Sequence, residues 1–387
     1  MNKSIIICIT TLLIITGCGD SKQSSTQNNG LITVDVTASY PEKEIILQDY
    51  MDVEYIPLET ADEFVCQGVV LDIGNNHIVV KNNINDGDIF IFDRNGKALK
   101  KFNRKGQGPE EYNDIIWVTI DEDNGEIFLN DQNKKRIAVY DLEGNFKRSL
   151  PFKEESIYSE IYNFDRGNLI CYDENDYIHL GQSFLIISKE DGNITKDIQI
   201  PFKEKKSTTT VSKNEASGFS FVAKLSWALH LAPHFNNWIL PELSSDTIYS
   251  YSPDHIIKPL IVRTPPIQSM EAEVFLFLNF LTDSYYFMRT IEMTKNNKAT
   301  DLLYDKQQKT IFNYTMYNGD YSSEKEASSR RIRLINNGIL PRLSLNADKL
   351  VEDYEKGLLK GKLKEIAATL DDDSNPVIMV IKHKLTK

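Results

Sequence analysis

A repeat of 48 residues is the feature that most limits how this chain folds. Three segments share one pattern, in which an alternating run of β-forming residues leads into a polar turn that ends in glycine: 88–96, 136–144 and 183–192. The final glycines, Gly96, Gly144 and Gly192, are 48 positions apart both times, and another strand-like run follows each turn. A period of about 40 to 50 residues with several strands per unit is typical of the blades of a β-propeller.

Weaker copies of the pattern follow later in the chain. Segment 247–254 precedes a strand-like run at 259–263, and segment 301–306 precedes another at 310–314. These five hairpins need one more unit, which we expect from strands near both ends of the chain: 31–36, 53–58 and 377–383. Because a closed ring leaves no free sheet edge, the sequence predicts an all-β fold, a six-bladed β-propeller closed by strands from both termini.

One segment near the C-terminus has a helical pattern. Apolar residues recur at helical spacing from Asn346 to Leu370, and Asn346 or Asp348 is suited to cap the start. Gly357 and Gly361 weaken the middle of this helix. We expect helix 346–370 to pack against the propeller, within a single domain over 31–387; a partner-binding helix is the alternative.

The N-terminus has the three parts of a secretory signal. Lys3 is followed by an apolar run of 11 residues and then by Ile15-Thr-Gly-Cys18. A run this short does not span a bilayer, which takes roughly 20 apolar residues. The sequence predicts a lipoprotein signal peptide over 1–17, a lipid on the Cys18 thiol and a polar, flexible tether over 18–30. An ordinary signal peptide cut elsewhere is the alternative.

Charge and cysteine content limit the partners. The chain carries 44 Lys and Arg against 56 Asp and Glu, a net charge of −12. An acidic chain is a poor ligand for nucleic acid and does not offer a basic membrane-binding face. The expected membrane contact is therefore the lipid anchor. Beyond Cys8 and Cys18, only Cys66 and Cys171 are present. Two distant cysteines do not make a disulfide framework, and we expect both to be buried, with a single bridge between them as the alternative.

Four segments resemble a family of known fold. They are Ile56–Thr60, Phe92–Lys97, Gly106–Tyr112 and Asp371–Val377, and they occur in the same order in the six-bladed β-propeller lipoproteins that are abundant in Bacteroides and relatives. The most specific segment is Gly-Gln-Gly-Pro-Glu-Glu-Tyr, which is similar to the family's Gly-x-Gly-Pro-Gly-Glu-Tyr. Glu110 stands where the family usually has glycine. The resemblance implies a fold and an envelope location, and it implies no activity because function is not fixed by fold.

The same glycine-containing loop is the best candidate for a ligand site. It links the last strand of one predicted blade to the first strand of the next, and in a propeller such links lie near a mouth of the central channel. Its charged and aromatic side chains are candidates for ligand contact: Arg104, Lys105, Glu110, Glu111 and Tyr112. The alternative is that this loop only joins adjacent blades.

Other motifs give no catalytic or metal site. His230 and His234 are four residues apart, but no Glu follows His230 and Pro233 disfavours a helix. Asp121–Gly125 resembles the start of a calcium loop, yet the later positions do not match, and we predict a hairpin turn. The sequence contains no G-x-S-x-G and no P-loop. We therefore expect no cofactor and no metal, and we assign no catalytic residue.

Two classes of function fit these observations. The first is a non-enzymatic binding module on the cell envelope, lipid-anchored to the outer membrane, that captures a glycan, a peptide or an envelope protein. The second is a polysaccharide lyase or hydrolase whose acid and base lie at the channel mouth. A structural part of an envelope complex is a third possibility. The sequence does not decide which side of the outer membrane the protein faces.

Overall fold

The computed structural model describes residues 31–174, 183–206, 208–213, 220–224, 230–293, 297–327, 332–335, 338–341 and 344–384. The predicted signal peptide, Cys18 and the predicted tether lie outside the described residues.

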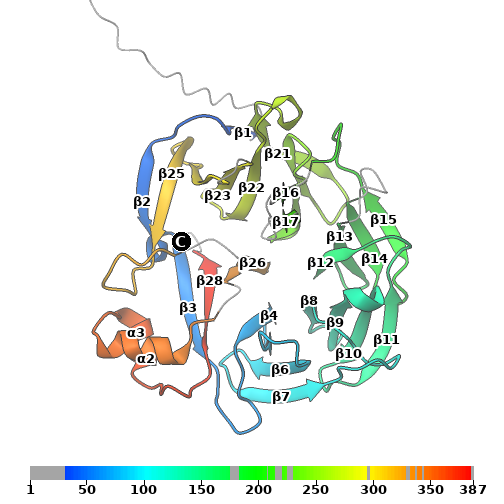
Figure 1. The fold of residues 1–387 in the computed structure, drawn as a ribbon, viewed down its shortest axis with the longest axis vertical. Helices are drawn as coiled ribbons and strands as arrows, with labels where there is room; N and C mark the ends of the chain where they lie inside the picture. Colours follow the sequence, from blue (N-terminus) through cyan, green and yellow to red (C-terminus); the bar gives the residue numbers. More distant parts are fainter. Residues whose placement is uncertain are drawn as a thin grey trace, which may run out of the picture.

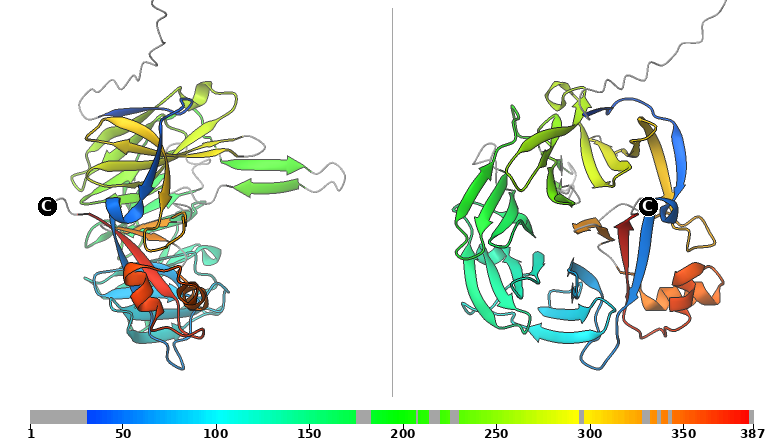
Figure 2. Two further views of the ribbon diagram at one scale, coloured as in Figure 1. Left: turned by 90° about the vertical axis from the view of Figure 1, so that its left-hand side faces the viewer. Right: turned by 180° about the vertical axis from the view of Figure 1, so that it is seen from behind.

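The described chain consists mostly of β-strands, which confirms the all-β fold class. Six sheets of four or five strands are arranged around a common axis (Figure 1). A seventh sheet has only two strands, β16 (Thr209–Lys213) and β17 (Ser220–Lys224). This hairpin projects from one face of the molecule, away from the ring of sheets (Figure 2).

Three sheets are each formed by four consecutive strands, and we number the sheets in chain order. Sheet 1 contains β4 (Val69–Ile73), β5 (His77–Lys81), β6 (Asp88–Asp93) and β7 (Ala98–Asn103). Sheet 2 contains β8 (Trp117–Asp121), β9 (Glu126–Asp131), β10 (Arg136–Asp141) and β11 (Phe146–Pro151), with the 3-10 helix η1 (Gln132–Lys134) after β9. Sheet 3 contains β12 (Tyr158–Asn163), β13 (Asn168–Asp173), β14 (Phe184–Ser188) and β15 (Ile194–Ile198).

The other three sheets each include a strand from the N-terminal segment. Sheet 4 contains β18 (Ala232–His234), β19 (Asn237–Leu240), β20 (Thr247–Tyr251), β21 (Ile257–Thr264) and β1 (Ile32–Asp35). Sheet 5 follows the 3-10 helix η2 (Ile267–Ser269) and contains β22 (Val274–Leu281), β23 (Tyr285–Glu292), β24 (Ala299–Asp305), β25 (Thr310–Tyr317) and β2 (Glu42–Ile46). Sheet 6 contains β26 (Ile332–Ile335), β27 (Gly338–Pro341), β28 (Val377–His383) and β3 (Met51–Pro57).

The connections lie on two opposite faces of the ring. Successive strands within a sheet are antiparallel, so the turns after the first and third strands lie at the same end. We call that end the turn face. The opposite end, which carries the links from one sheet to the next, is the crossover face. The β16–β17 hairpin belongs to the link between sheets 3 and 4 and therefore projects from the crossover face.

Close packing between sheets explains the glycines of the 48-residue repeat. Each repeat glycine ends the turn between the third and fourth strands, and Gly96 has a φ of +85° that favours glycine. A Cβ at Gly96 would lie 2.0 Å from the carbonyl oxygen of Pro57 in sheet 6, and one at Gly144 would lie 2.6 Å from the ring of Phe102 in sheet 1. In sheets 1 and 2 this turn therefore needs a residue without a side chain, because it packs against the outer strand of the preceding sheet.

The N-terminal segment runs along the outer strands of three successive sheets. β1 pairs in parallel with β21, and β2 pairs in parallel with β25. The short helix α1 (Leu47–Tyr50) then leads into β3, which pairs antiparallel with β28. The prediction that 31–36 joins the same sheet as 377–383 is therefore wrong. Ile32 and Val34 instead pack into the core shared by sheets 4 and 5.

The hydrophobic core lies between neighbouring sheets. One cluster joins sheet 1 to sheet 2 and includes Val79, Ile91, Val118 and Tyr140, each at most 1% exposed. Such packed interfaces repeat from sheet to sheet. Cys66 and Cys171 lie in these cores as free thiols, so the expectation that both are buried is confirmed and they do not pair.

Two short helices replace the single predicted helix. They are α2 (Ala347–Glu355) and α3 (Gly361–Ala367), which lie outside the ring (Figure 1). Gly357 has a φ of +67°, a conformation that commonly ends helices. The expected continuous helix over 346–370 is therefore wrong in its middle, although Leu350, Leu363 and Ile366 pack against sheet 6 as expected. No helix in the described part of the chain is long and apolar enough to cross a bilayer.

Candidate functional site

The predicted ligand loop lies on the crossover face and is bound closely to sheet 2. Tyr112 is fully buried, and its hydroxyl donates to the Gly87 carbonyl at 2.6 Å. The Lys134 ammonium donates to the carbonyls of Gly106 at 3.0 Å and Gly108 at 2.9 Å. These contacts join sheets 1 and 2.

The charged side chains of that loop lie at its surface. Arg104 is exposed, and its Nε donates to the Gly144 carbonyl at 3.0 Å. Lys105 and Glu110 are also exposed, while Glu111 is half-buried and accepts a hydrogen bond from the Gly108 N–H at 2.8 Å. None of these side chains reaches the cavity described next.

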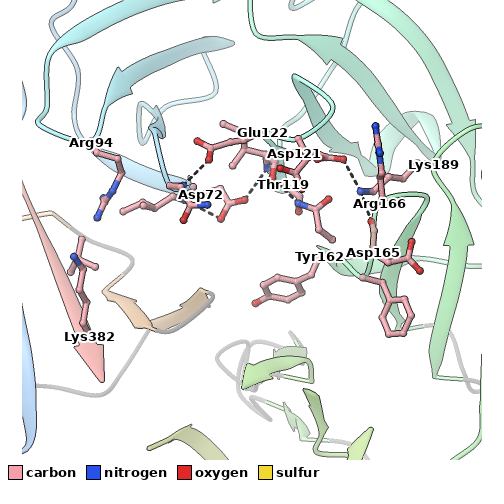
Figure 3. A pocket seen from close by; sticks show the side chains of 18 of the residues that line it. Asp72, Arg94, Thr119, Asp121, Glu122, Tyr162, Asp165, Arg166, Lys189 and Lys382 are labelled. Atoms are coloured by element: carbon pink, nitrogen blue, oxygen red, sulfur yellow. Dashed lines mark hydrogen bonds and ion pairs between the residues drawn. The ribbon is translucent and has the colours of Figure 1, made fainter. Parts of the chain in front are cut away.

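A cavity of about 750 Å³ opens at the centre of the turn face (Figure 3). Five of the six sheets supply its lining, which includes Glu54 and Lys382 of sheet 6, Asp72 and Arg94 of sheet 1, Thr119 to Asp123 of sheet 2, Tyr162 to Arg166 and Lys189 of sheet 3, and Trp238 of sheet 4. A volume of this size is in the usual range for small-molecule sites.

The innermost strands of sheets 1, 2 and 3 bring polar residues to the cavity. In β4 the register shifts between Val70 and Asp72, which marks a β-bulge. Bulges turn a side chain out of strict alternation and are common near binding sites. Asp72 accepts hydrogen bonds from the N–H groups of Ile73 at 3.0 Å and Ile120 at 2.9 Å, and it thereby joins sheets 1 and 2.

Glu122 binds the turn between β4 and β5. Its carboxylate accepts hydrogen bonds from the N–H groups of Asn75 at 2.8 Å, Asn76 at 2.8 Å and His77 at 2.9 Å. Partial burial favours the protonated acid, but these N–H groups and the His77 ring hold the pKa of Glu122 below its ordinary value. Glu122 is therefore a structural carboxylate rather than a proton donor.

A buried ion pair joins sheets 2 and 3 at the cavity wall. The Lys189 ammonium lies 2.6 Å from the Asp121 carboxylate, and each side chain is only 6% exposed. Lys189 also donates to the Asp165 carbonyl at 2.7 Å, as Figure 3 shows. Removal of either partner would leave the other as an unpaired buried charge. The pair therefore holds sheets 2 and 3 together at this wall.

The opposite side of the cavity carries a second charged group. Glu54 Oε2 contacts Arg94 at 3.1 Å and Lys382 at 2.6 Å, so one carboxylate serves two cations. Arg166 lies on the cavity rim, where it is exposed.

Aromatic residues form the wall between sheets 3 and 4. The rings of Tyr162 and Trp238 lie 5.5 Å apart, and Phe164 stacks on His255 at 5.8 Å with an interplanar angle of 9°. Phe164 is half-buried, so part of its ring is available at the cavity. The cavity therefore offers apolar ring surface beside hydrogen-bond donors and acceptors.

The two histidines and the acidic turn occupy ordinary strand and turn positions. His230 lies before β18 and contacts Glu160 at 3.0 Å, whereas His234 lies within β18, so no helix brings the two together. Asp121–Gly125 is the turn between β8 and β9, as predicted. Among the described residues, no group of three or more His, Cys, Asp or Glu side chains is placed to hold a metal ion.

Individual turns were predicted from the sequence, but it did not show that they converge on one cavity. Asp121–Gly125 and 164–167 each follow an innermost strand, so both lie on the turn face. The 48-residue repeat was the available signal, because equivalent turns of a repeated unit lie on the same face. The partners of these turn residues come from neighbouring sheets, and a local pattern does not show them.

The solved structures to which this chain is similar have low sequence identity to it. One, from Bacteroides fragilis and named as an exported protein, has a TM-score of 0.61 and 15% identity and covers 92% of this chain and 100% of its own. A member of the duf4221 family from Bacteroides vulgatus has a TM-score of 0.47 and 11% identity and covers 87% and 98%. Virginiamycin B lyase from Staphylococcus aureus has a TM-score of 0.37 and 12% identity, covering 86% and 99%.

The first of these similarities supports the fold only, and the other two are too weak to support an argument. No curated protein matches the sequence significantly. A family model described as a domain of unknown function, DUF4934, matches residues 31–382, which is nearly all of the described chain. The chain therefore belongs to the DUF4934 family.

Proposed function

We propose that this protein is an exported, lipid-anchored binding module that captures a glycan in the cavity of the turn face. The observation that carries the proposal is the composition of that cavity. Aromatic rings from sheets 3 and 4 face a set of hydrogen-bonding groups that includes both cations and carboxylates. Sugars present hydroxyl groups that donate and accept, together with apolar ring faces, so a neutral or mixed-charge glycan suits this lining.

We propose further that the six sheets are the blades of a six-bladed β-propeller. Their arrangement around one axis supports this count (Figure 1). The pairing of β3 with β28 supports closure by strands from near both ends of the chain. A ring of this kind supplies a rigid wall for a binding site, because each sheet packs against its two neighbours.

A binding role is preferred to hydrolysis on chemical grounds. Glycoside hydrolases use a pair of carboxyl groups, one of which has a raised pKa and donates a proton. Three of the cavity carboxylates, Asp72, Asp121 and Glu122, instead hold backbone N–H groups or a lysine. The pKa of Glu122 is displaced downward, which is opposite to the need of a general acid.

Calorimetry and product analysis on the same samples test the binding site. The mature chain is titrated with a panel of polysaccharides, and the mixtures are then analysed for released fragments. We expect binding without fragments, weakened by Arg166→Ala at the cavity and unchanged by Arg104→Ala in the crossover loop. Loss of binding in Arg104→Ala alone would assign the site to the loop instead. Fragment release would show an enzyme, and no binding to any glycan would contradict the proposed ligand class.

Cell fractionation tests the anchor. We propose that the protein is cut before Cys18 and acylated there, with outer-membrane attachment; the name of the Bacteroides fragilis relative supports an exported location. Cys18→Ala should leave the protein without lipid and shift it from the membrane fraction to the soluble fraction. A variant that stays membrane-bound would rule out this anchor.

A further inference from the structure

The position of the first strand determines where a tether leaves the ring. β1 runs parallel to β21, and β21 runs from the turn face toward the crossover face, where it continues into η2. The chain therefore enters β1 at the turn face, on the outer edge of sheet 4 (Figure 2). The mouth of the cavity opens on that same face.

The length of chain between the proposed anchor and β1 is short. The segment 18–30 contains 13 residues. A polar coil of that length has a mean end-to-end distance, or mean span, of about 20 Å. The eight residues of β21 extend about 26 Å from the turn face to the crossover face. If the crossover face lay on the lipid, the tether would have to run the length of β21, about 26 Å, along the outer edge of sheet 4. That distance exceeds the mean span of the tether.

The hairpin on the other face gives a second, independent reason. β16 and β17 project from the crossover face, and their five residues each extend about 17 Å. They pair with each other and with no further strand in the described chain. Their segments contain Lys213 and Lys224. A two-stranded hairpin has unpaired backbone N–H and C=O groups along its edges, which are strongly disfavoured in a bilayer, so it keeps the crossover face away from the lipid.

We propose that the turn face, with its cavity, is held against the membrane surface, and that the β16–β17 hairpin points away from it. This inference rests on the proposed acylation of Cys18. It means that the cavity takes its ligand from the layer next to the lipid rather than from bulk solvent. The partner surface is the bilayer itself, within reach of a tether about 20 Å long.

Four variants test the orientation, each with one added cysteine that is labelled with a fluorophore on the lipidated full chain. On the turn face, Ile256→Cys lies in sheet 4 near β1 and Asn95→Cys lies in sheet 1, farther from it. On the crossover face, Ser269→Cys lies near sheet 4 and Ile84→Cys lies in sheet 1. All four positions are exposed, whereas Cys66 and Cys171 are buried and should not react.

The labelled proteins are bound to phosphatidylethanolamine–phosphatidylglycerol vesicles that carry a quencher in the headgroup layer. We expect stronger quenching at Ile256→Cys and Asn95→Cys than at Ser269→Cys and Ile84→Cys. Insertion of a 40-residue Gly/Ser segment after Gly30 should remove the difference.

Other patterns overturn the proposal. Stronger quenching at Ile256→Cys and Ser269→Cys would show that the ring stands on its edge, and equal quenching at all four sites would show no fixed orientation. Flotation with the vesicles is measured in the same samples. A protein that floats without the expected pattern contradicts the orientation alone, whereas a protein that does not float contradicts the anchor and so the proposed function.

Discussion

The outer edges of sheets 1 and 2 differ from those of sheets 4 and 5. β7 and β11 are the outermost strands of their sheets, and they carry Lys100, Lys101, Lys147 and Arg148. β25 has no charged residue over its eight positions, and β2 covers it. An uncovered edge strand is a site for aggregation unless charge or proline blocks it. The two halves of the ring therefore protect their edges differently, one with lysine and arginine and the other with the N-terminal segment.

The same contrast appears within a single strand. In β21, Lys258 and Pro259 lie where β1 does not pair, and both are exposed. Ile261 to Thr264 pair with β1, and Ile261 is fully buried. The exposed lysine and the proline thus lie in the uncovered part of the strand, whereas the covered part holds the buried side chains of Ile261 and Arg263. The N-terminal strands are a structural part of the domain rather than an extension of the tether.

The largest expected effect comes from a charge placed under the N-terminal cover. Val34 is fully buried in β1, so Val34→Asp should lower the free energy of unfolding by about 4 kcal/mol, the usual effect of an unpaired buried charge. The matched change on an uncovered edge is Leu99→Asp in β7, where the native side chain is 47% exposed; it should change stability by less than about 0.5 kcal/mol. Urea unfolding measures both. Equal losses would mean that the two edges do not differ.

The next effect concerns how sheets 2 and 3 are joined. Lys189→Met removes the cation from a buried pair and leaves the Asp121 carboxylate without it, which should reduce stability by about 3 kcal/mol. The control is Lys100→Met, whose partner Glu143 is 69% exposed, so a change below about 1 kcal/mol is expected. Thermal unfolding separates the two. A stable Lys189→Met variant would show that the pair does not hold the cavity wall.

The repeat glycines provide a smaller test of the packing between sheets. Gly96→Ala and Gly125→Ala both force alanine into a left-handed backbone, which alone amounts to about 1–2 kcal/mol. A Cβ at Gly125 meets nothing within 4 Å, whereas one at Gly96 meets the Pro57 carbonyl. Chemical unfolding should therefore show the greater loss for Gly96→Ala. Equal losses would mean that backbone conformation alone selects glycine in the repeat.

The smallest effect is a difference in acid sensitivity between the two halves. Burial lowers the pKa of His234, in sheet 4, from 6.5 to about 4. The unfolded chain therefore takes up a proton first, and the stability from neutral His234 is lost as the pH falls from 6.5 to about 4. For Glu122, in sheet 2, the folded pKa is lowered, so its contribution is present above pH 4.5 and is lost only below it.

Two variants separate these contributions in unfolding measurements from pH 7 to pH 3. His234→Gln should flatten the pH dependence of stability between pH 6.5 and 4, and Glu122→Gln should flatten it below pH 4.5. If His234→Gln leaves the upper range unchanged, the histidine does not determine the loss of stability there.

Local patterns in the sequence predicted much of the fold. The strands around Gly96, Gly144 and Gly192 were predicted because alternation and turn residues are local signals. β2 was missed, since Glu42–Ile46 has a weak pattern and becomes a strand by pairing with β25, far away in the sequence. The break at Gly357 was underestimated, because the spacing of apolar residues continues across it.

The candidate site was less predictable than the fold. The cavity depends on side chains that meet across sheet boundaries, such as Glu122 with the β4–β5 turn and Lys189 with Asp121. Each of these residues appears in the sequence as an ordinary turn or strand-end residue. Their shared surroundings follow from tertiary structure alone, so no local pattern identified them.

The pairing of β3 with β28 has a consequence for folding during synthesis. More than 300 residues separate the two strands, and the closure of so long a loop is entropically unfavourable and tends to be slow. Sheet 6 cannot gain its third strand until residues 377–383 have left the ribosome. A product truncated before Val377 would leave β3 without its partner strand, and an open strand edge of this kind promotes aggregation.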